Sequence, residues 1–139
     1  MKYQKDLDEI PSCPPQNAQS KSTEAYRIVH DPLCCKSFMP PGKISPSRVK
    51  NKNSGSQNCS LLALSFFTNE QEAIRHYKAL EKKINNIHKT IGGYLAFGKL
   101  SANDGLQTPP GRNTHFDFYE SKNTQLDSKF KITKKMSER

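Results

Sequence analysis

The sequence predicts an α+β fold in which a small mixed sheet packs on one long amphipathic helix. Three observations predict it: an apolar run at residues 60–67, apolar residues at helical spacing from Ala73 to Ile91, and a second apolar run at residues 94–100. Extended runs on both sides of a helical pattern indicate a β–α–β unit, whose right-handed crossover would place the two strands parallel.

The two ends of the chain are polar. Residues 1–23 contain Pro11, Pro14 and Pro15 and few apolar side chains, so we expect a disordered N-terminal arm. Residues 24–139 are expected to form a single domain with a basic C-terminal tail. No run approaches the ~18 apolar residues of a membrane helix. The first ten residues lack the apolar stretch of a secretory signal, so we expect a cytoplasmic protein without a membrane span.

A first strand is predicted at residues 23–30, where Tyr26, Ile28 and Val29 supply β-forming side chains and Asp31-Pro32 ends the run. The next segment, residues 36–58, is rich in proline, glycine and cations. A connection of this length inside a compact domain is either a functional loop or a disordered insertion. We therefore expect a long basic loop there, and a strand buried on both faces at residues 60–67.

The helix is predicted over residues 69–90. Thr68 and Gln71 have the spacing of a capping box, and Gly92-Gly93 supplies a stop. The stripe expected to face the sheet consists of Ala73, Tyr77, Leu80, Ile84, Ile87 and Ile91.

The strand after this unit is predicted at residues 114–120, because the residues there alternate strictly. Phe116 and Phe118 share one face, and His115, Asp117 and Tyr119 share the other. A histidine beside a carboxylate is suited to general acid–base chemistry, although a polar face on a one-sided strand is the plainer interpretation. The tail beyond residue 121 either adds a last strand or remains loose.

The four cysteines do not form a recognisable pattern for metal binding. Cys34 and Cys35 are adjacent, which does not match the paired ligand spacing of zinc sites, so no metal is expected. In a cytoplasmic protein the thiols are expected to be reduced, and Cys59 is expected to be a small buried hydrophobic residue.

The formal charge of +9 favours an anionic partner. The leading hypothesis is a non-catalytic binding component, with no cofactor, whose basic surface meets an anionic macromolecule, either nucleic acid or an acidic protein. No sequence-reading motif is present, so phosphate contacts would dominate. The expected anion-binding residues are Lys43, Arg48, Lys50, Lys52 and Arg112.

The alternative hypothesis is an enzyme. GxxxxGK[ST], GxGxxG and HExxH motifs are absent. However, an arginine on the first strand (Arg27), a Ser or Thr at the end of the second (Ser65 or Thr68) and a late glutamate (Glu120) together resemble the arrangement of ADP-ribosyltransferase-like domains.

The resemblance covers residues 25–120 and implies that NAD would lie in a cleft between small sheets. It implies that Arg27 would contact the dinucleotide, that Ser65 would shape the pocket, and that Glu120 would orient the ribose, with His115 lining the site. The chain departs from the family pattern because it has neither a Glu-x-Glu pair nor a Ser-Thr-Ser element.

Overall fold

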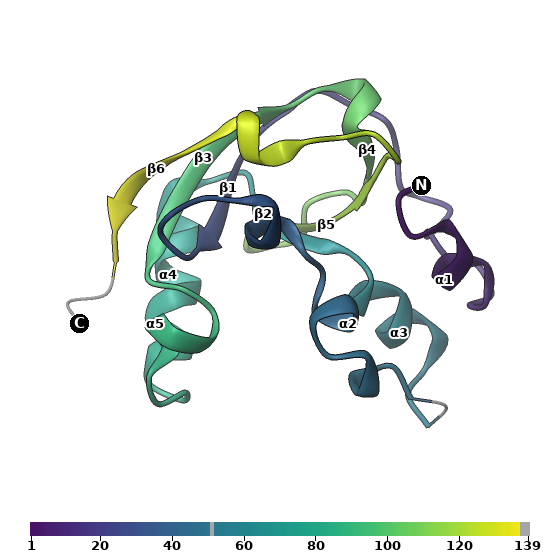
Figure 1. Ribbon diagram of the computed structural model, residues 1–139, viewed down its shortest axis with the longest axis horizontal. Coiled ribbons are helices and arrows are strands. Elements are labelled where there is room, and N and C mark those ends of the chain that lie inside the picture. Colours follow the sequence, from purple (N-terminus) through teal and green to yellow (C-terminus); the bar gives the residue numbers. More distant parts are fainter. Residues whose placement is uncertain (51, 137–139) are drawn as a thin grey trace.

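The computed structural model describes residues 1–50 and 52–136, and over these it has an α+β fold built on one six-stranded antiparallel sheet (Figure 1). The order across the sheet is β4-β5-β2-β1-β3-β6. The strands are β1 (Thr23–Val29), β2 (Leu64–Phe67), β3 (Tyr94–Leu100), β4 (Gly105–Gln107), β5 (His115–Glu120) and β6 (Phe130–Lys135). The basic tail therefore adds a last strand; its final residues, 137–139, lie outside the described part.

The prediction of a mixed sheet with parallel neighbours is wrong. Strands β2 and β3 run in the same direction, but β1 lies between them and pairs antiparallel with both. The long connection between β1 and β2 allows β1 to occupy that central place, so every hydrogen-bonded neighbour is antiparallel.

The single long helix is also not observed. It is replaced by α4 (Glu70–Glu81) and a short α5 (Ile87–Thr90). Asn86, between them, has a φ of 57°, a left-handed conformation that asparagine tolerates better than most residues and that interrupts the helix. The N-cap is Asn69, whose side chain accepts a bond from the Glu72 amide, rather than Thr68. Gly92, with a φ of 127°, lies just beyond α5 as the predicted stop.

The predicted loop at residues 36–58 is mostly short helices. These are η1 (Cys35–Phe38), α2 (Pro41–Ile44), η2 (Pro46–Arg48) and α3 (Gly55–Leu61); residue 51 lies outside the described part. Ser54 and Gln57 form a capping box at the start of α3. Because α3 takes residues up to Leu61, the second strand is shorter than predicted and begins at Leu64.

The predicted N-terminal arm is folded onto the domain, which corrects the expectation of disorder. It contains α1 (Gln4–Asp8), and Leu7 is buried with Leu62, Ala63 and Tyr119. A disulfide joins Cys13 to Cys59, so the prediction that all four thiols are reduced is wrong for this pair, whereas Cys34 and Cys35 are free and exposed. Leu7 and the disulfide are among the contacts that anchor this segment, and its polar composition predicted none of them.

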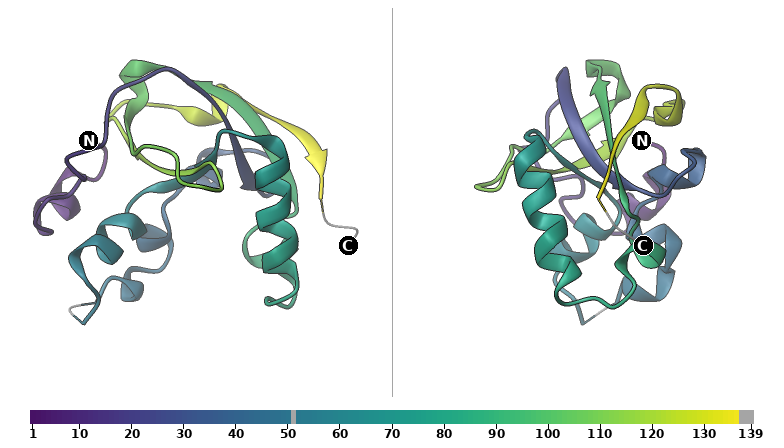
Figure 2. Two further views of the ribbon diagram at one scale, coloured as in Figure 1. Left: turned by 180° about the vertical axis from the view of Figure 1, so that it is seen from behind. Right: turned by 90° about the vertical axis from the view of Figure 1, so that its left-hand side faces the viewer.

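The main core lies on one face of the sheet, where Phe66, Phe116, Phe118 and Phe130 pack with Phe38 of η1. On the other face, Ala73 of α4 packs against Phe67 and Leu95. Figure 2 shows α4–α5 and α2–α3 as two arms that extend from the curved sheet. Across the described ranges, none of the helices has the length and apolar character needed to cross a membrane.

Candidate functional site

The sheet is weakly joined at its centre, and the candidate site lies at this junction. Strands β1 and β2 are in register only at Tyr26 and Phe67, whereas β1 pairs with β3 along its whole length. Beyond Tyr26 the two strands diverge. The sheet therefore consists of two halves, β4-β5-β2 and β1-β3-β6, with room for side chains between them.

Arg27 occupies this divergence. Its Nε donates to the Ser37 carbonyl and its Nη1 to the Ser65 carbonyl, both at 3.0 Å. The guanidinium also lies 5.8 Å from the ring centre of Phe38 and 5.7 Å from that of Phe66. Burial lowers the pKa of Arg27 to about 10, against the opposing effect of the Glu120 charge, so the group remains a cation at neutral pH.

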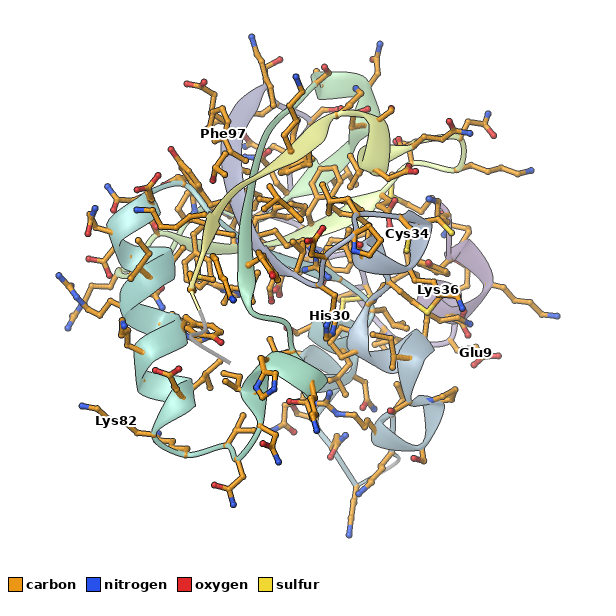
Figure 3. The ribbon with its side chains drawn as sticks, turned by 60° about the vertical axis from the view of Figure 1, so that its left-hand side comes forward. Glu9, His30, Cys34, Lys36, Lys82 and Phe97 are labelled. Carbon is orange, nitrogen blue, oxygen red and sulfur yellow. A yellow bond between two sulfur atoms is a disulfide. The ribbon has the colours of Figure 1, made fainter. Side chains whose placement is uncertain are left out.

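A cleft of about 590 Å³ opens beside Arg27, between the two arms. It is lined by the end of β1, by η1, α2 and η2 on one side, and by α4 and α5 on the other. Its basic side chains are Arg27, His30, Lys36, Arg48 and His76, and no Asp or Glu of the described residues is among its lining. Figure 3 shows His30 between the arms, with Lys36 on the η1 side.

Apolar side chains complete the cleft. Met39 and Ile44 come from the α2 side, and Leu80 and Ile91 come from the α4–α5 arm. Ile44 is 62% exposed, which is unusual for an isoleucine in this fold. Cations and accessible apolar groups together suit a ligand that has an anionic group, such as a phosphate or a carboxylate, and an aromatic or aliphatic part.

A polar cluster lies on the sheet face next to the cleft. The Nε2 atom of His115 is 3.0 Å from Ser65 Oγ and 4.0 Å from Asp117 Oδ1. Ser60 Oγ donates to the other Asp117 oxygen at 2.9 Å, and burial raises the pKa of Asp117. The serine and the carboxylate both approach the same ring nitrogen, so the arrangement is not a serine–histidine–aspartate relay, in which each would need its own nitrogen.

Tyr119 completes the polar face predicted for this strand, but it is buried. Its hydroxyl contacts the sulfur and the carbonyl oxygen of Cys59, each at 3.2 Å. Burial raises its pKa, so it stays a neutral phenol. His76, on α4, has a lowered pKa because it is partly buried and faces His115, which favours its neutral form.

Glu120 lies on the same sheet face as Arg27. Arg27 contacts Phe66, Phe66 contacts Phe118, and Glu120 is two residues beyond Phe118 on β5. The carboxylate is only 4% exposed, and Oε2 accepts a bond from Lys2 Nζ at 2.8 Å. Oε1 is buried without a hydrogen-bond partner among the described residues. Burial raises the pKa of Glu120, and the charges of Lys2 and Arg27 oppose the shift.

The residues of the predicted enzyme site thus divide between two faces. Arg27 and Glu120 share one face, whereas the side chains of Ser65 and His115 project from the other. Ser65 lines the cleft, and its carbonyl oxygen accepts from Arg27. Thr68 follows the end of β2, and its amide donates to the Thr114 carbonyl. Its described hydrogen bonds include none to Arg27 or Glu120.

The predicted anion-binding residues are also dispersed. Arg48 lines the cleft, whereas Lys43 is paired with Asp6 at 3.0 Å. Lys50 and Lys52 are exposed near the tip of the α2–α3 arm, and exposed Arg112 is in the connection between β4 and β5. These last three cations are not among the residues that line the cleft.

Sequence reasoning missed His30, Lys36 and His76 as one group, because they come from the end of a strand, a short helix and a different arm. It also missed Lys2, which no local pattern links to Glu120, 118 residues away. The described residues contain no cluster of three or more His, Cys, Asp or Glu side chains placed to hold a metal ion.

Comparisons with protein-family models, with curated proteins and with solved structures find no match for this chain.

Proposed function

We propose that the protein is a binding module for an anionic macromolecule and that single-stranded nucleic acid enters the cleft between the two arms. The observation that carries this proposal is the charge of the cleft wall: three cations (Arg27, Lys36 and Arg48), two histidines and, among the described residues, no acidic side chain surround a volume of about 590 Å³. A cleft whose charged side chains are all cationic attracts phosphates. The attraction is stronger in a cleft than on an open surface, because the surrounding low-dielectric protein limits screening by water.

The chemistry of the cleft fits a single strand better than a duplex. Lys36 and Arg48 are exposed cations that can neutralise phosphates, and Met39, Ile44 and Leu80 offer apolar contacts to an unstacked base. A rigid duplex cannot place a base in a recess, whereas a single strand can. Recognition through phosphates and base faces would be largely independent of sequence.

Fluorescence anisotropy with a short labelled single-stranded oligonucleotide tests the proposal. Replacing Lys36 and Arg48 together by Glu should weaken binding strongly. It should also reduce the slope of log K against log salt by about 1.4, since each lost phosphate contact changes this slope by about 0.7. Lys82→Glu/Lys83→Glu is the matched control, because it reverses the same number of charges on two exposed lysines that follow α4 and do not line the cleft (Lys82 is labelled in Figure 3). Equal weakening by the control would assign binding to net charge and not to the cleft.

The second candidate is an ADP-ribosyltransferase-like enzyme that uses NAD. It is favoured by one observation: Arg27 and Glu120 come from strands on either side of β2 and share one face of the sheet, where each charge influences the other. A dinucleotide carries phosphates, so the same basic cleft would suit them; Glu120 is buried and does not line this cleft, so this candidate also requires that Glu120 be uncovered.

The enzyme candidate is tested by following nicotinamide release from NAD. Glu120→Gln should abolish release and leave the fold intact, since glutamine keeps the shape and removes the charge. Asp127→Asn, on an exposed carboxylate of η4 (Leu126–Ser128), is the control. Release that persists in Glu120→Gln would remove Glu120 from the chemistry.

A cytoplasmic location remains part of the proposal. In a reducing compartment a disulfide such as Cys13–Cys59 is usually transient or redox-sensing, which gives that link a function beyond stability.

A further inference from the structure

The N-terminal segment crosses the end of β5 and covers Glu120. The Lys2 amide donates to the Glu120 carbonyl at 2.8 Å, and Lys2 Nζ donates both to Glu120 Oε2 and to the Thr124 carbonyl. Backbone and side chain of the same lysine therefore hold the same glutamate, whose side chain is 2% exposed. We call residues 2–18 the strap.

The strap is fastened at a few separate points. Leu7 is buried at 2% exposure against Leu62, Ala63 and Tyr119, and Asp6 pairs with Lys43 of α2 at 3.0 Å. The far end is fixed where Gln19 and Gln107 exchange two backbone bonds, each of 2.8 Å. Between these points the disulfide ties Cys13 to Cys59 on α3.

Glu120 is poorly satisfied in this covered state. Its Oε1 has no hydrogen-bond partner among the described residues, although the atom is buried. A buried carboxylate oxygen without a donor is costly, so uncovering the group would recover hydration. Uncovering Glu120 would therefore break its bond to Lys2 and, in return, would hydrate the Oε1 atom.

A reductant can reach the link. A cavity of about 620 Å³ lies beside it, lined on one side by strap residues that include Ser12 and Gln16, and on the other by Cys59 and Tyr119. Cys13 is half-buried, whereas Cys59 is only 3% exposed. Cys59 lines this cavity and Cys13 does not, but Cys13 is the more exposed of the two residues, so we take its sulfur as the point of attack.

We propose that the strap is a redox-released cover: reduction of Cys13–Cys59 by a dithiol frees residues 2–18 and exposes Glu120 to solvent and ligand. A thiolate of the dithiol attacks the Cys13 sulfur, and the Cys59 thiolate leaves and takes up a proton. The second thiol of the reductant then attacks the mixed disulfide, which releases the Cys13 thiol and leaves the dithiol oxidised to its own disulfide. Two electrons pass from the reductant to the cysteine pair.

The inference goes beyond both candidate functions, since it concerns access to Glu120 and not the ligand. If Glu120 serves an NAD-using enzyme, reduction activates it. If the protein only binds nucleic acid in the cleft, the cover still opens and Glu120 becomes reactive without any turnover.

Carboxyl labelling measures this access directly. The full chain, carrying Cys34→Ser and Cys35→Ser to prevent thiol shuffling, is treated with a water-soluble carbodiimide and glycine ethyl ester, with and without dithiothreitol. Peptide mass spectrometry then gives the labelling rate of each carboxylate. Glu120 should react at least about tenfold faster after reduction, as expected when a buried group becomes locally open. Glu9, which is exposed on the strap itself (Figure 3), should react equally in both states.

Amide hydrogen exchange separates local release from unfolding. After reduction, residues 2–13 should exchange nearly as fast as an unfolded chain, while amides in the β1–β3 pairing lose at most the protection that the lower global stability removes and stay far slower than the strap. Reoxidation should restore both the slow exchange and the slow labelling of Glu120. Cys13→Ser should match the reduced protein without any reductant, and Lys2→Met with the disulfide intact should stay slower than Cys13→Ser.

Two results would overturn the proposal. One is a Glu120 labelling rate that is the same in the oxidised and reduced proteins. The other is a loss of protection in β1 and β3 equal to that in the strap, which would mean that reduction unfolds the domain and does not open a cover. Nicotinamide release and oligonucleotide binding, measured on the same samples, report separately on the two candidate functions.

Discussion

At the scale of single residues, Arg27 is a half-buried cation whose hydrogen bonds go to the backbone. It joins the carbonyl of Ser37 on η1 to that of Ser65 on β2, so one side chain connects segments on both sides of the divergence in the sheet. The rings of Phe38 and Phe66 lie close to its guanidinium. This is a structural role that a ligand-binding arginine need not have, and it makes the residue important even without a ligand.

Arg27→Met should therefore destabilise the fold by about 2 kcal/mol, because it removes two charge-assisted bonds and leaves two carbonyls without their donor. Urea unfolding followed by circular dichroism measures the change. Arg75→Met is the control: Arg75 is an exposed helix residue paired with Glu72, and its loss should cost less than about 0.5 kcal/mol. Similar midpoints for the two variants would mean that Arg27 does not join the halves.

Glu120 predicts a pH dependence of stability. Its pKa is raised in the folded protein above the ordinary value of 4.5, by burial first and against the charges of Lys2 and Arg27; Tyr3 also lies within electrostatic reach. A raised carboxyl pKa means that the folded state holds its proton longer. Its stabilising contribution is complete below pH 4.5 and is lost as the pH rises through the folded-state pKa.

The glutamine in Glu120→Gln cannot ionise, so the variant does not lose stability at this position as the pH rises. The free energy of unfolding of the variant, relative to the wild type, should therefore shift in favour of the variant between about pH 4 and neutral pH. Asp117 also has a raised pKa but is present in both proteins, so its effect cancels. Urea titrations at the two pH values give the difference, and a constant offset between the proteins would show that Glu120 titrates normally.

At the scale of elements, the break between α4 and α5 depends on Asn86 and its φ of 57°. Asn86→Val should cost about 1–2 kcal/mol, because a side chain with a branched Cβ is disfavoured in the left-handed region, whereas Asn86→Gly should be close to neutral. Thermal unfolding compares the two. Asn85→Val is the matched neighbour, with no left-handed conformation to lose. If Asn86→Val were tolerated as well as Asn85→Val, the break would have another cause.

Elements with a strong local pattern were predictable. The alternation of Phe116 and Phe118 with His115 and Asp117 predicts β5, and the periodicity from Ala73 to Tyr77 predicts α4. The expected extension of that helix to residue 90 was wrong, because apolar spacing continues through Asn86 while the backbone does not. The spacing of apolar residues indicates which side chains are buried. It does not indicate the turn at Asn86, which allows two short helices to bury the same side chains.

Contacts between distant parts of the sequence were not predictable in this way. Nothing near Cys13 indicates Cys59, and nothing near Lys2 indicates Glu120. Polar composition predicted disorder for the N-terminal segment, but a buried leucine, a disulfide and the bonds of Lys2 to distant residues hold it on the domain. The basic cleft was missed for the same reason. Lys36, Arg48 and His76 are far apart in the sequence, and they line one cleft only because β1 and β2 diverge in the folded chain.

At the scale of the whole molecule, the sheet behaves as two halves with a narrow connection. The disulfide joins two points separated by 46 residues, a stretch that contains β1, the short helices and most of α3. The closed loop therefore includes β1, the strand of the β1-β3-β6 half that borders the other half. The disulfide should therefore lower the conformational entropy of the unfolded chain and stabilise the whole domain, in addition to holding the strap in place.

The double variant Cys13→Ser/Cys59→Ser should consequently lower the global free energy of unfolding by about 4 kcal/mol, the loop-closure entropy expected for this separation. Wild-type protein unfolded in urea with dithiothreitol should lose the same amount. Cys34→Ser, which removes an exposed free thiol, is the control and should change little. A loss below about 1 kcal/mol would mean that the denatured chain already keeps Cys13 near α3. In that case the disulfide would remove little conformational entropy from the denatured chain, and the strap would be held mainly by the contacts of Leu7 and Lys2.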